Sequence, residues 1–167
     1  MPHRSGRRSF LRGQFCHSTI KRPPGAVDAE VFAKQCTKCN ACIDACPELI
    51  ILRDEDGLPQ VDLRRGACTF CGVCARACKP QAILPASGWD WRAHVTNACL
   101  SLQGVTCRTC EDQCDNQAIS FKLMAGGKSE PQINNKLCNG CGACAAACPT
   151  GAVSFYETQQ HSEEKPC

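Results

Sequence analysis

Apolar positions along this chain come in short runs that are interrupted by turn residues and by cysteines. The sequence IILRDEDGLPQVDL, residues 50–63, places apolar stretches on either side of Asp56-Gly57, which predicts a β-hairpin. Residues 119–133, ISFKLMAGGKSEPQI, repeat this arrangement around Gly126-Gly127 and predict a second hairpin. Because PQV in the first stretch is echoed by PQI in the second, we interpret the two as related halves of the chain.

The apolar runs are too short to supply a large core or a membrane crossing. A membrane helix needs about 18 consecutive apolar residues, and nothing in the sequence approaches that length. The hydrophobic fraction of 43% includes 18 cysteines among 167 residues, so the other apolar residues build only a thin core. Small domains with such cores depend on disulfides or metal sites for stability.

The cellular compartment of a protein decides whether its cysteines form disulfides or bind metal. The N-terminal sequence of this chain argues against export. The stretch before Ala26 is basic and lacks the apolar segment of about 7–15 residues that a signal peptide requires. We therefore expect a soluble protein without a membrane span, and its export is not indicated. Its cysteines are then expected to be thiolates on metal.

Cysteine spacing gives the chain its organisation. The pattern Cys-x2-Cys-x2-Cys-x3-Cys occurs three times, and bacterial ferredoxins use this run to hold four-iron clusters. Zinc suits the pattern poorly because it needs four thiolates around one ion, and no histidine is placed to suggest a Rieske site. The three copies are Cys36, Cys39, Cys42 and Cys46; Cys68, Cys71, Cys74 and Cys78; and Cys138, Cys141, Cys144 and Cys148.

A fourth copy is interrupted by an insertion. Cys107, Cys110 and Cys114 keep the spacing of the last three positions, and LSLQGVT separates them from Cys99. In all four copies an apolar pair begins four positions after the last cysteine, which marks this stretch as a repeat. We interpret Cys99 as the displaced first ligand. The alternative, a spare thiol at Cys99, would leave three ligands and a labile or three-iron cluster.

The fourth cysteine of each copy lies about one helical turn beyond the third and, in two-cluster ferredoxins, ligates the other cluster. This crossing predicts four sets of cysteines for four [4Fe-4S] clusters. Cys16 and Cys167 fall outside every copy and are interpreted as spare thiols. The predicted sets are set 1, Cys36, Cys39, Cys42 and Cys78; set 2, Cys68, Cys71, Cys74 and Cys46; set 3, Cys99, Cys107, Cys110 and Cys148; and set 4, Cys138, Cys141, Cys144 and Cys114.

The repeats predict an α+β fold of two tandem bacterial-ferredoxin-like modules with small cores, plus flexible N- and C-terminal tails. We expect Trp89 and Trp91 to pack the two halves together, with docking on a partner as the alternative. Four oxidised clusters of roughly −2 each would turn the formal charge of +3 negative, so the charge does not indicate nucleic-acid binding. The predicted divisions are a basic arm 1–29, a first module 30–86, a linker 87–97, a second module 98–156 and a tail 157–167.

With the cysteine groups in place, the chain resembles the NapF-type ferredoxins, accessory iron–sulfur proteins of periplasmic nitrate reductase systems. The resemblance covers nearly the whole chain and rests on the group ACLSLQGVTCRTCEDQC and on the motifs SGRRSFLRG, RPPG and WDW. It implies [4Fe-4S] clusters on the sixteen cysteines of sets 1–4, a cytoplasmic location, and contact with the catalytic molybdenum subunit before its export. Lys79 after Cys78 departs from the pattern and affects local geometry only.

The expected function is electron transfer together with maturation of that catalytic subunit. No acid–base pair, activated nucleophile or nucleotide-binding loop is recognisable, so we expect no enzyme activity. Two alternatives stay open: an electron-carrier subunit of another oxidoreductase, and a binding module in which clusters serve only as structural staples.

The arm GRRSFLR, with Arg7-Arg8, resembles a twin-arginine export motif without the apolar segment that should follow. The sequence does not indicate the oligomeric state.

Overall fold

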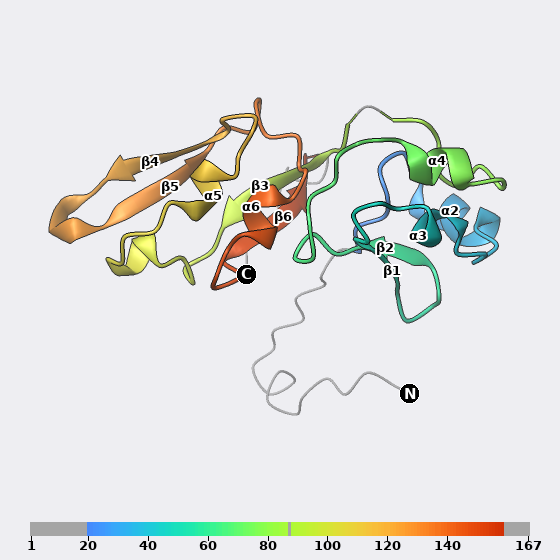
Figure 1. Cartoon of the computed structure of the whole chain (residues 1–167), viewed down its shortest axis with the longest axis horizontal. Helices are drawn as coiled ribbons and strands as arrows, with labels where there is room; N and C mark the ends of the chain where they lie inside the picture. The colour runs from blue at the N-terminus through green and yellow to red at the C-terminus, as the bar shows by residue number, and fades with distance from the viewer. Residues whose placement is uncertain (1–19, 87, 159–167) are drawn as a thin grey trace.

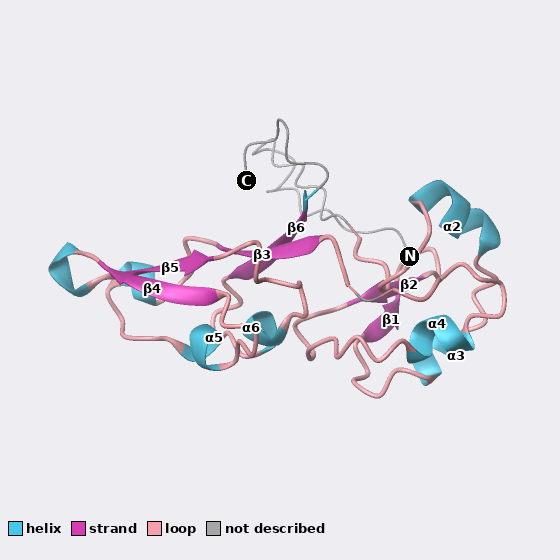
Figure 2. Cartoon of the chain, turned by 90° about the horizontal axis from the view of Figure 1, so that it is seen from above, coloured by secondary structure: helices cyan, strands magenta, loops and turns pink. Residues whose placement is uncertain are grey.

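The computed structural model of the chain describes residues 20–86 and 88–158, which form two modules. The modules lie end to end along the long axis of the molecule (Figure 1). Short helices and two-stranded sheets make up both of them, so the predicted α+β class is confirmed (Figure 2). Residues 1–19 and 159–167, with most of the predicted tails, lie outside the described residues.

The first module is built around the predicted hairpin. Strands β1 and β2 pair antiparallel with Ile51 opposite Val61, and Gly57 in the turn has a φ of 78° that favours glycine. A single bridge between Ala26 and Ile83 joins the start of the module to its end. The elements are α2 (Ala29–Gln35), α3 (Ala41–Asp44), β1 (Ile51–Arg53), β2 (Pro59–Val61) and α4 (Val73–Ala77).

The second module repeats this plan with longer strands. The second predicted hairpin is confirmed, because β4 and β5 pair antiparallel with Ile119 opposite Ile133. Strands β3 and β6 pair from Trp91 opposite Glu157 to Val95 opposite Val153. The elements are β3 (Trp91–Val95), η1 (Ser101–Gln103), α5 (Thr109–Asp112), β4 (Ile119–Leu123), η2 (Ala125–Gly127), β5 (Ser129–Ile133), α6 (Ala143–Ala146) and β6 (Val153–Glu157).

The structure differs from the predicted divisions at both module starts. The stretch 87–97, predicted as a linker, contains β3, which belongs to a sheet of the second module. The stretch 1–29, predicted as an arm, contains Ala26, which bridges to Ile83 of the first module. Both segments pair with residues far along the chain, and such pairing leaves too little local alternation to be recognised.

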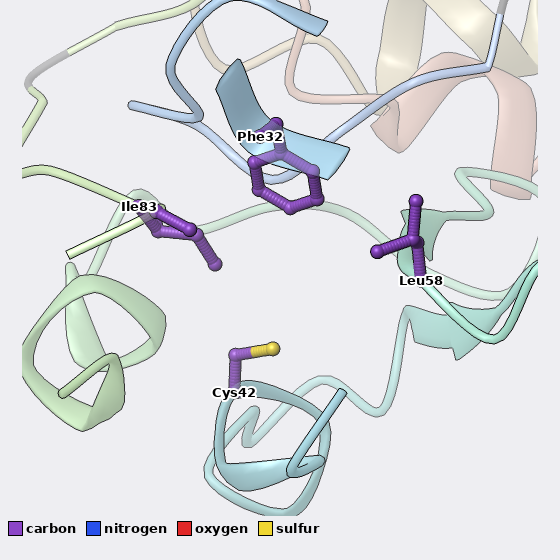
Figure 3. Packing of buried hydrophobic residues seen from close by; sticks show 5 residues of the cluster. Phe32, Cys42, Leu58 and Ile83 are labelled. Atoms are coloured by element: carbon purple, nitrogen blue, oxygen red, sulfur yellow. The ribbon is translucent and has the colours of Figure 1, made fainter. Parts of the chain in front are cut away.

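The thin core is divided into three clusters of buried side chains. The first contains Phe32, Leu58, Ala82 and Ile83 together with Cys42. Figure 3 shows the sulfur of Cys42 pointing into the space between Phe32, Leu58 and Ile83. Cysteines also line the other two clusters, so their sulfur atoms are part of the interior that holds each module together.

The modules pack against each other through aromatic residues. Trp89 and Phe155 both contact a core cluster of the first module that includes Ile50 and Leu63. Trp91 is buried, and the Nζ atom of Lys21 from the first module lies 5.2 Å from its ring centre. The prediction that the two tryptophans pack the halves together is therefore confirmed. No helix within residues 20–86 or 88–158 has the length and apolar character to cross a membrane.

Candidate metal centres

The sixteen cysteines of the four repeats gather around four hollows. Each hollow is lined by the four members of one predicted set, although the fourth member comes from a different copy of the repeat. Cys99 lies with Cys107, Cys110 and Cys148, as the interpretation of the displaced ligand requires. Together with the solvent space at its mouth, each hollow encloses about 380 Å³ at set 1, 510 Å³ at set 2, 350 Å³ at set 3 and 340 Å³ at set 4.

Left-handed backbone turns bring the first three cysteines of a copy to one hollow. Asn40, Gly72 and Gly142 have φ values of 67°, 68° and 92°, and each directly precedes the short helix that carries the third cysteine. The interrupted copy differs here, since Arg108 at the same position has a φ of −133°. Three copies therefore share a loop conformation, and the insertion changes it in the fourth.

Each fourth cysteine lines the hollow of the neighbouring copy. In the second module the apolar pair that follows also holds this cysteine in place. The N–H of Ala118 donates to Sγ of Cys114 over 3.3 Å, and the N–H of Ala152 donates to Sγ of Cys148 over the same 3.3 Å. Both alanine side chains are buried. In these two copies the apolar pair thus packs in the core and also places a backbone donor on the sulfur.

Burial holds several of the thiols in their protonated form when no metal is bound. It raises the pKa of Cys42, Cys68 and Cys110 to about 11 and that of Cys144 to about 12. A thiolate is the form that binds metal, so metal binding at these positions must release protons.

Two exposed thiols instead have pKa values that are lowered. The pKa values of Cys39 and Cys71 lie below the ordinary value of 9.0, chiefly because a backbone N–H two positions on donates to each sulfur. A threonine hydroxyl two positions before each cysteine adds a second hydrogen bond. Sequence reasoning missed these threonines, which the repeated Cys-Thr-x-Cys pattern could have indicated; they are Thr37 and Thr69.

Ser101 is a second residue that sequence reasoning missed. Its side chain is 1% exposed, and its hydroxyl donates to the carbonyl oxygen of Cys107 over 2.5 Å. The N–H of Val105 donates to the carbonyl oxygen of Leu100, which closes the inserted stretch into a compact loop. The insertion therefore keeps Cys99 beside the other members of set 3. No sequence pattern marked this serine.

The chemistry of the donor sets fits iron–sulfur clusters. Four thiolates around one zinc ion converge to about 2.3 Å from it, whereas a [4Fe-4S] cluster is held by four cysteines around a larger group. Within residues 20–86 and 88–158 no group of three or more cysteine, histidine or carboxylate side chains is placed to hold a single ion. Each set instead surrounds a hollow with apolar lining, and all sixteen described cysteines are free thiols.

Comparison with known proteins identifies the family of this chain. Residues 35–82 and 105–152 each match the 4Fe-4S dicluster domain family. The chain is 40% identical to the ferredoxin-type protein NapF of Escherichia coli strain K12 over 94% of this chain and 98% of that protein. The chain belongs to the NapF family of ferredoxin-type proteins. NapF of Haemophilus influenzae strain KW20 is 39% identical over 93% of this chain and 96% of its own length.

Two dicluster domains account for four [4Fe-4S] clusters in this NapF-family chain. A more distant relative, the ferredoxin-type protein NapG of Escherichia coli, is 29% identical over 76% of this chain and 65% of its own length. The second domain match begins at residue 105, beyond Cys99. Ligation by individual cysteines stays a prediction, and for Cys99 it is supported by the position of that thiol in set 3. Cys16, Cys167 and Arg7-Arg8 lie outside the described residues.

Proposed function

We propose that this chain is a cytoplasmic electron carrier and accessory protein that binds the catalytic molybdenum subunit of periplasmic nitrate reductase and assists its maturation before export. The observation that carries the proposal is the match to NapF over 94% of the chain and 98% of the relative. Four complete cysteine sets in one short chain support the electron-transfer part.

In such a carrier the bound clusters supply the redox chemistry, and the protein holds the clusters and shapes their surroundings. Bound clusters supply one-electron oxidation and reduction. The chain's own residues hold the thiolates, surround each set with apolar side chains and place N–H donors on sulfur, as Ala118 and Ala152 do. Hydrogen bonds to sulfur and exclusion of water are the means by which a protein tunes cluster potentials. The proposed role includes no catalytic residue.

Anaerobic co-purification tests the proposed partner. Tagged chain is isolated from cells that express the catalytic molybdenum subunit, and the bound fraction is probed for that subunit with its export signal intact. We expect the precursor form to be enriched over the mature form. An unrelated cytoplasmic molybdoenzyme serves as the negative control. Absence of the precursor from chain that carries its full iron content would instead favour a general carrier of another oxidoreductase.

A structural role for the clusters is the second candidate. It is favoured by the cysteines within the core, where Cys42 and Cys144 are buried among apolar side chains. Redox titration separates the two candidates, because a carrier needs clusters that can be reduced at physiological potentials. Clusters that resist reduction in that range, in a chain that still binds its partner, would establish the structural role instead.

Location is tested separately in spheroplasts. We expect the chain to resist added protease until the cells are lysed, because the proposed partner is met before export. Digestion of the chain in intact spheroplasts, while a cytoplasmic marker survives, would contradict the cytoplasmic location.

A further inference from the structure

The two modules meet where set 2 and set 4 come together. The N–H of Cys68, a member of set 2, donates a hydrogen bond to the carbonyl oxygen of Cys141, a member of set 4, over 2.7 Å. Among the described residues this is the backbone hydrogen bond that crosses between the modules. A cysteine of each module is thus joined directly to a cysteine of the other.

A tight side-chain contact closes around this hydrogen bond. Leu63 of the first module is buried and packs on the backbone of Gly142, the residue after Cys141. A Cβ atom at position 142 would lie 2.6 Å from Cδ2 and 2.7 Å from Cβ of Leu63, so only glycine allows this approach. Phe155 of the second module packs on the same core cluster as Leu63.

Set 2 is the inner set of the first module, because Trp89 and Phe155 of the second module pack on the core cluster that Cys46, Cys68 and Cys74 line. Among the described residues, none from the second module packs on the cluster that contains Cys36, Cys42 and Cys78 of set 1.

Set 3 and set 4 are connected within the second module, where α5 carries Cys110 and α6 carries Cys144. Both views show α6 nearer to the first module than α5 (Figures 1 and 2). Set 4 is therefore the inner set of its module and set 3 the outer one.

We propose that Cys68, Cys141, Leu63 and Gly142 form an inner junction that couples the two modules electronically and orders the sets along the molecule as 1, 2, 4, 3. This order differs from the order along the chain, in which set 3 precedes set 4. Leu63 acts as a positioning residue that holds set 4 against set 2. The inference rests on the proposed function only in that the sets carry redox-active clusters. One electron leaves one module as the other gains it, with no bond broken and no proton moved.

Variants that keep two sets at a time test the order. Cys39→Ser with Cys107→Ser removes one ligand each from sets 1 and 3, and Cys71→Ser with Cys141→Ser removes one each from sets 2 and 4. Only preparations with about eight iron atoms per chain are compared, because these hold no cluster at the altered sets. Each protein is prepared anaerobically, its iron is counted, and it is reduced with dithionite for electron paramagnetic resonance. We expect split or broadened signals from interacting spins when sets 2 and 4 remain, and two isolated signals when sets 1 and 3 remain. The reverse result would overturn the proposed order.

Substitution of Leu63 tests the positioning role in the protein that retains sets 2 and 4. We expect Leu63→Ala to weaken the spin interaction while the iron content of these sets is kept, and Leu63→Met to preserve it. Leu58→Ala is the matched control, because Leu58 is equally buried but lies in the core cluster around Cys42 (Figure 3). An unchanged interaction in Leu63→Ala would overturn the role of Leu63. If Leu63→Ala loses iron, the paired-set variants still decide the order.

These measurements need no partner protein. If sets 2 and 4 show no spin interaction, the proposed junction is wrong, but the co-purification result still stands. Conversely, a chain that fails to bind the molybdenum subunit would still show whether sets 2 and 4 interact.

Discussion

The hydroxyl of Ser101 and the carbonyl oxygen of Cys107 are joined by a 2.5 Å hydrogen bond across the loop that separates Cys99 from the rest of its repeat. Ser101 is 1% exposed, so its hydroxyl is shielded from solvent. The inserted loop is therefore a folded part of set 3 and not a flexible interruption. Its stability decides whether Cys99 stays beside the other three thiols.

Ser101→Ala should loosen set 3 selectively. The substitution leaves the partly buried carbonyl oxygen of Cys107 without this donor, which costs about 1 kcal/mol. We expect iron at set 3, about four of sixteen atoms, to be released to a chelator faster than the rest. Ser120→Ala is the matched control, because that serine is exposed on β4 of the same module. Equal release rates in the two variants would contradict the role given to Ser101.

The iron count tests the interpretation of Cys99. Holo-protein prepared anaerobically should contain about sixteen iron and sixteen sulfide atoms per chain, four of each for every cluster. Cys99→Ser should lower the iron to between about twelve and fifteen, as the cluster is lost or converted to a three-iron form. Cys16→Ser lies outside every repeat and should keep the full count. A full count in Cys99→Ser would make Cys99 a spare thiol.

Arg22 should stabilise the first module through its partly buried ion pair. Its Nη1 atom lies 2.7 Å from Oδ2 of Asp54, and the two side chains are 19% and 4% exposed. Loss of one partner costs about 3–5 kcal/mol in a fully buried pair and at most about 1 kcal/mol in an exposed pair, so Arg22→Ala should lower the free energy of unfolding by about 1–3 kcal/mol. The pair of Arg108 and Glu111 offers the contrast, because its side chains are 53% and 29% exposed. Arg108→Ala should cost no more than about 1 kcal/mol in denaturant unfolding.

A result in which both arginine variants lose the same stability would contradict this ranking. It would mean that the ion pair of Arg22 is no more protected from solvent than the surface pair. The outcome also bears on the predicted arm, since Arg22 lies within residues 1–29.

Lys21 should make stability depend on pH. Burial, followed by the nearby charge of Arg64, lowers the pKa of Lys21 below its ordinary value of 10.5, so the folded chain releases this proton before the unfolded chain does. Below the folded pKa both states are charged and the buried charge costs stability; as pH rises toward 10.5 that cost disappears. The wild type should therefore gain stability relative to Lys21→Met as pH rises.

Denaturant unfolding of the holo-protein at neutral and alkaline pH measures this effect. Lys34→Met serves as the control, because Lys34 is exposed on α2. The wild-type minus Lys21→Met difference should increase with pH. A difference that stays constant or decreases would show that the rings of Trp91 and Phe155, which lie 5.2 and 5.8 Å from Nζ, outweigh burial.

Much of the site could be predicted because its signals are local. The cysteine spacing defines a loop and a helical turn, so the composition of all four sets followed from the crossing of the fourth cysteine. The hairpin turns at Gly57 and Gly126 were visible for the same reason, since each depends on neighbouring residues. The hairpins needed no information about distant parts of the chain, whereas the pairing of two copies within a module followed from the crossing known for two-cluster ferredoxins.

The features that were missed depend on contacts between distant segments. The sequence around β3 shows no strand signal because its partner, β6, lies some sixty residues further along the chain. The threonines and Ser101 act through hydrogen bonds to sulfur and to a carbonyl oxygen, and these bonds form only after the loops have folded.

By itself, the sequence determined the identity of the cluster-binding repeats, their grouping in four and the pairing of copies within each half, since these depend on spacings of a few residues. Only the tertiary structure decided that Cys68 lies against Cys141 and that the second half faces the first with set 4 inward. The reason is that packing between modules is set by the fit of buried surfaces such as Leu63 on Gly142. A contact of this kind joins residues far apart in the chain and leaves no periodic signal in either segment.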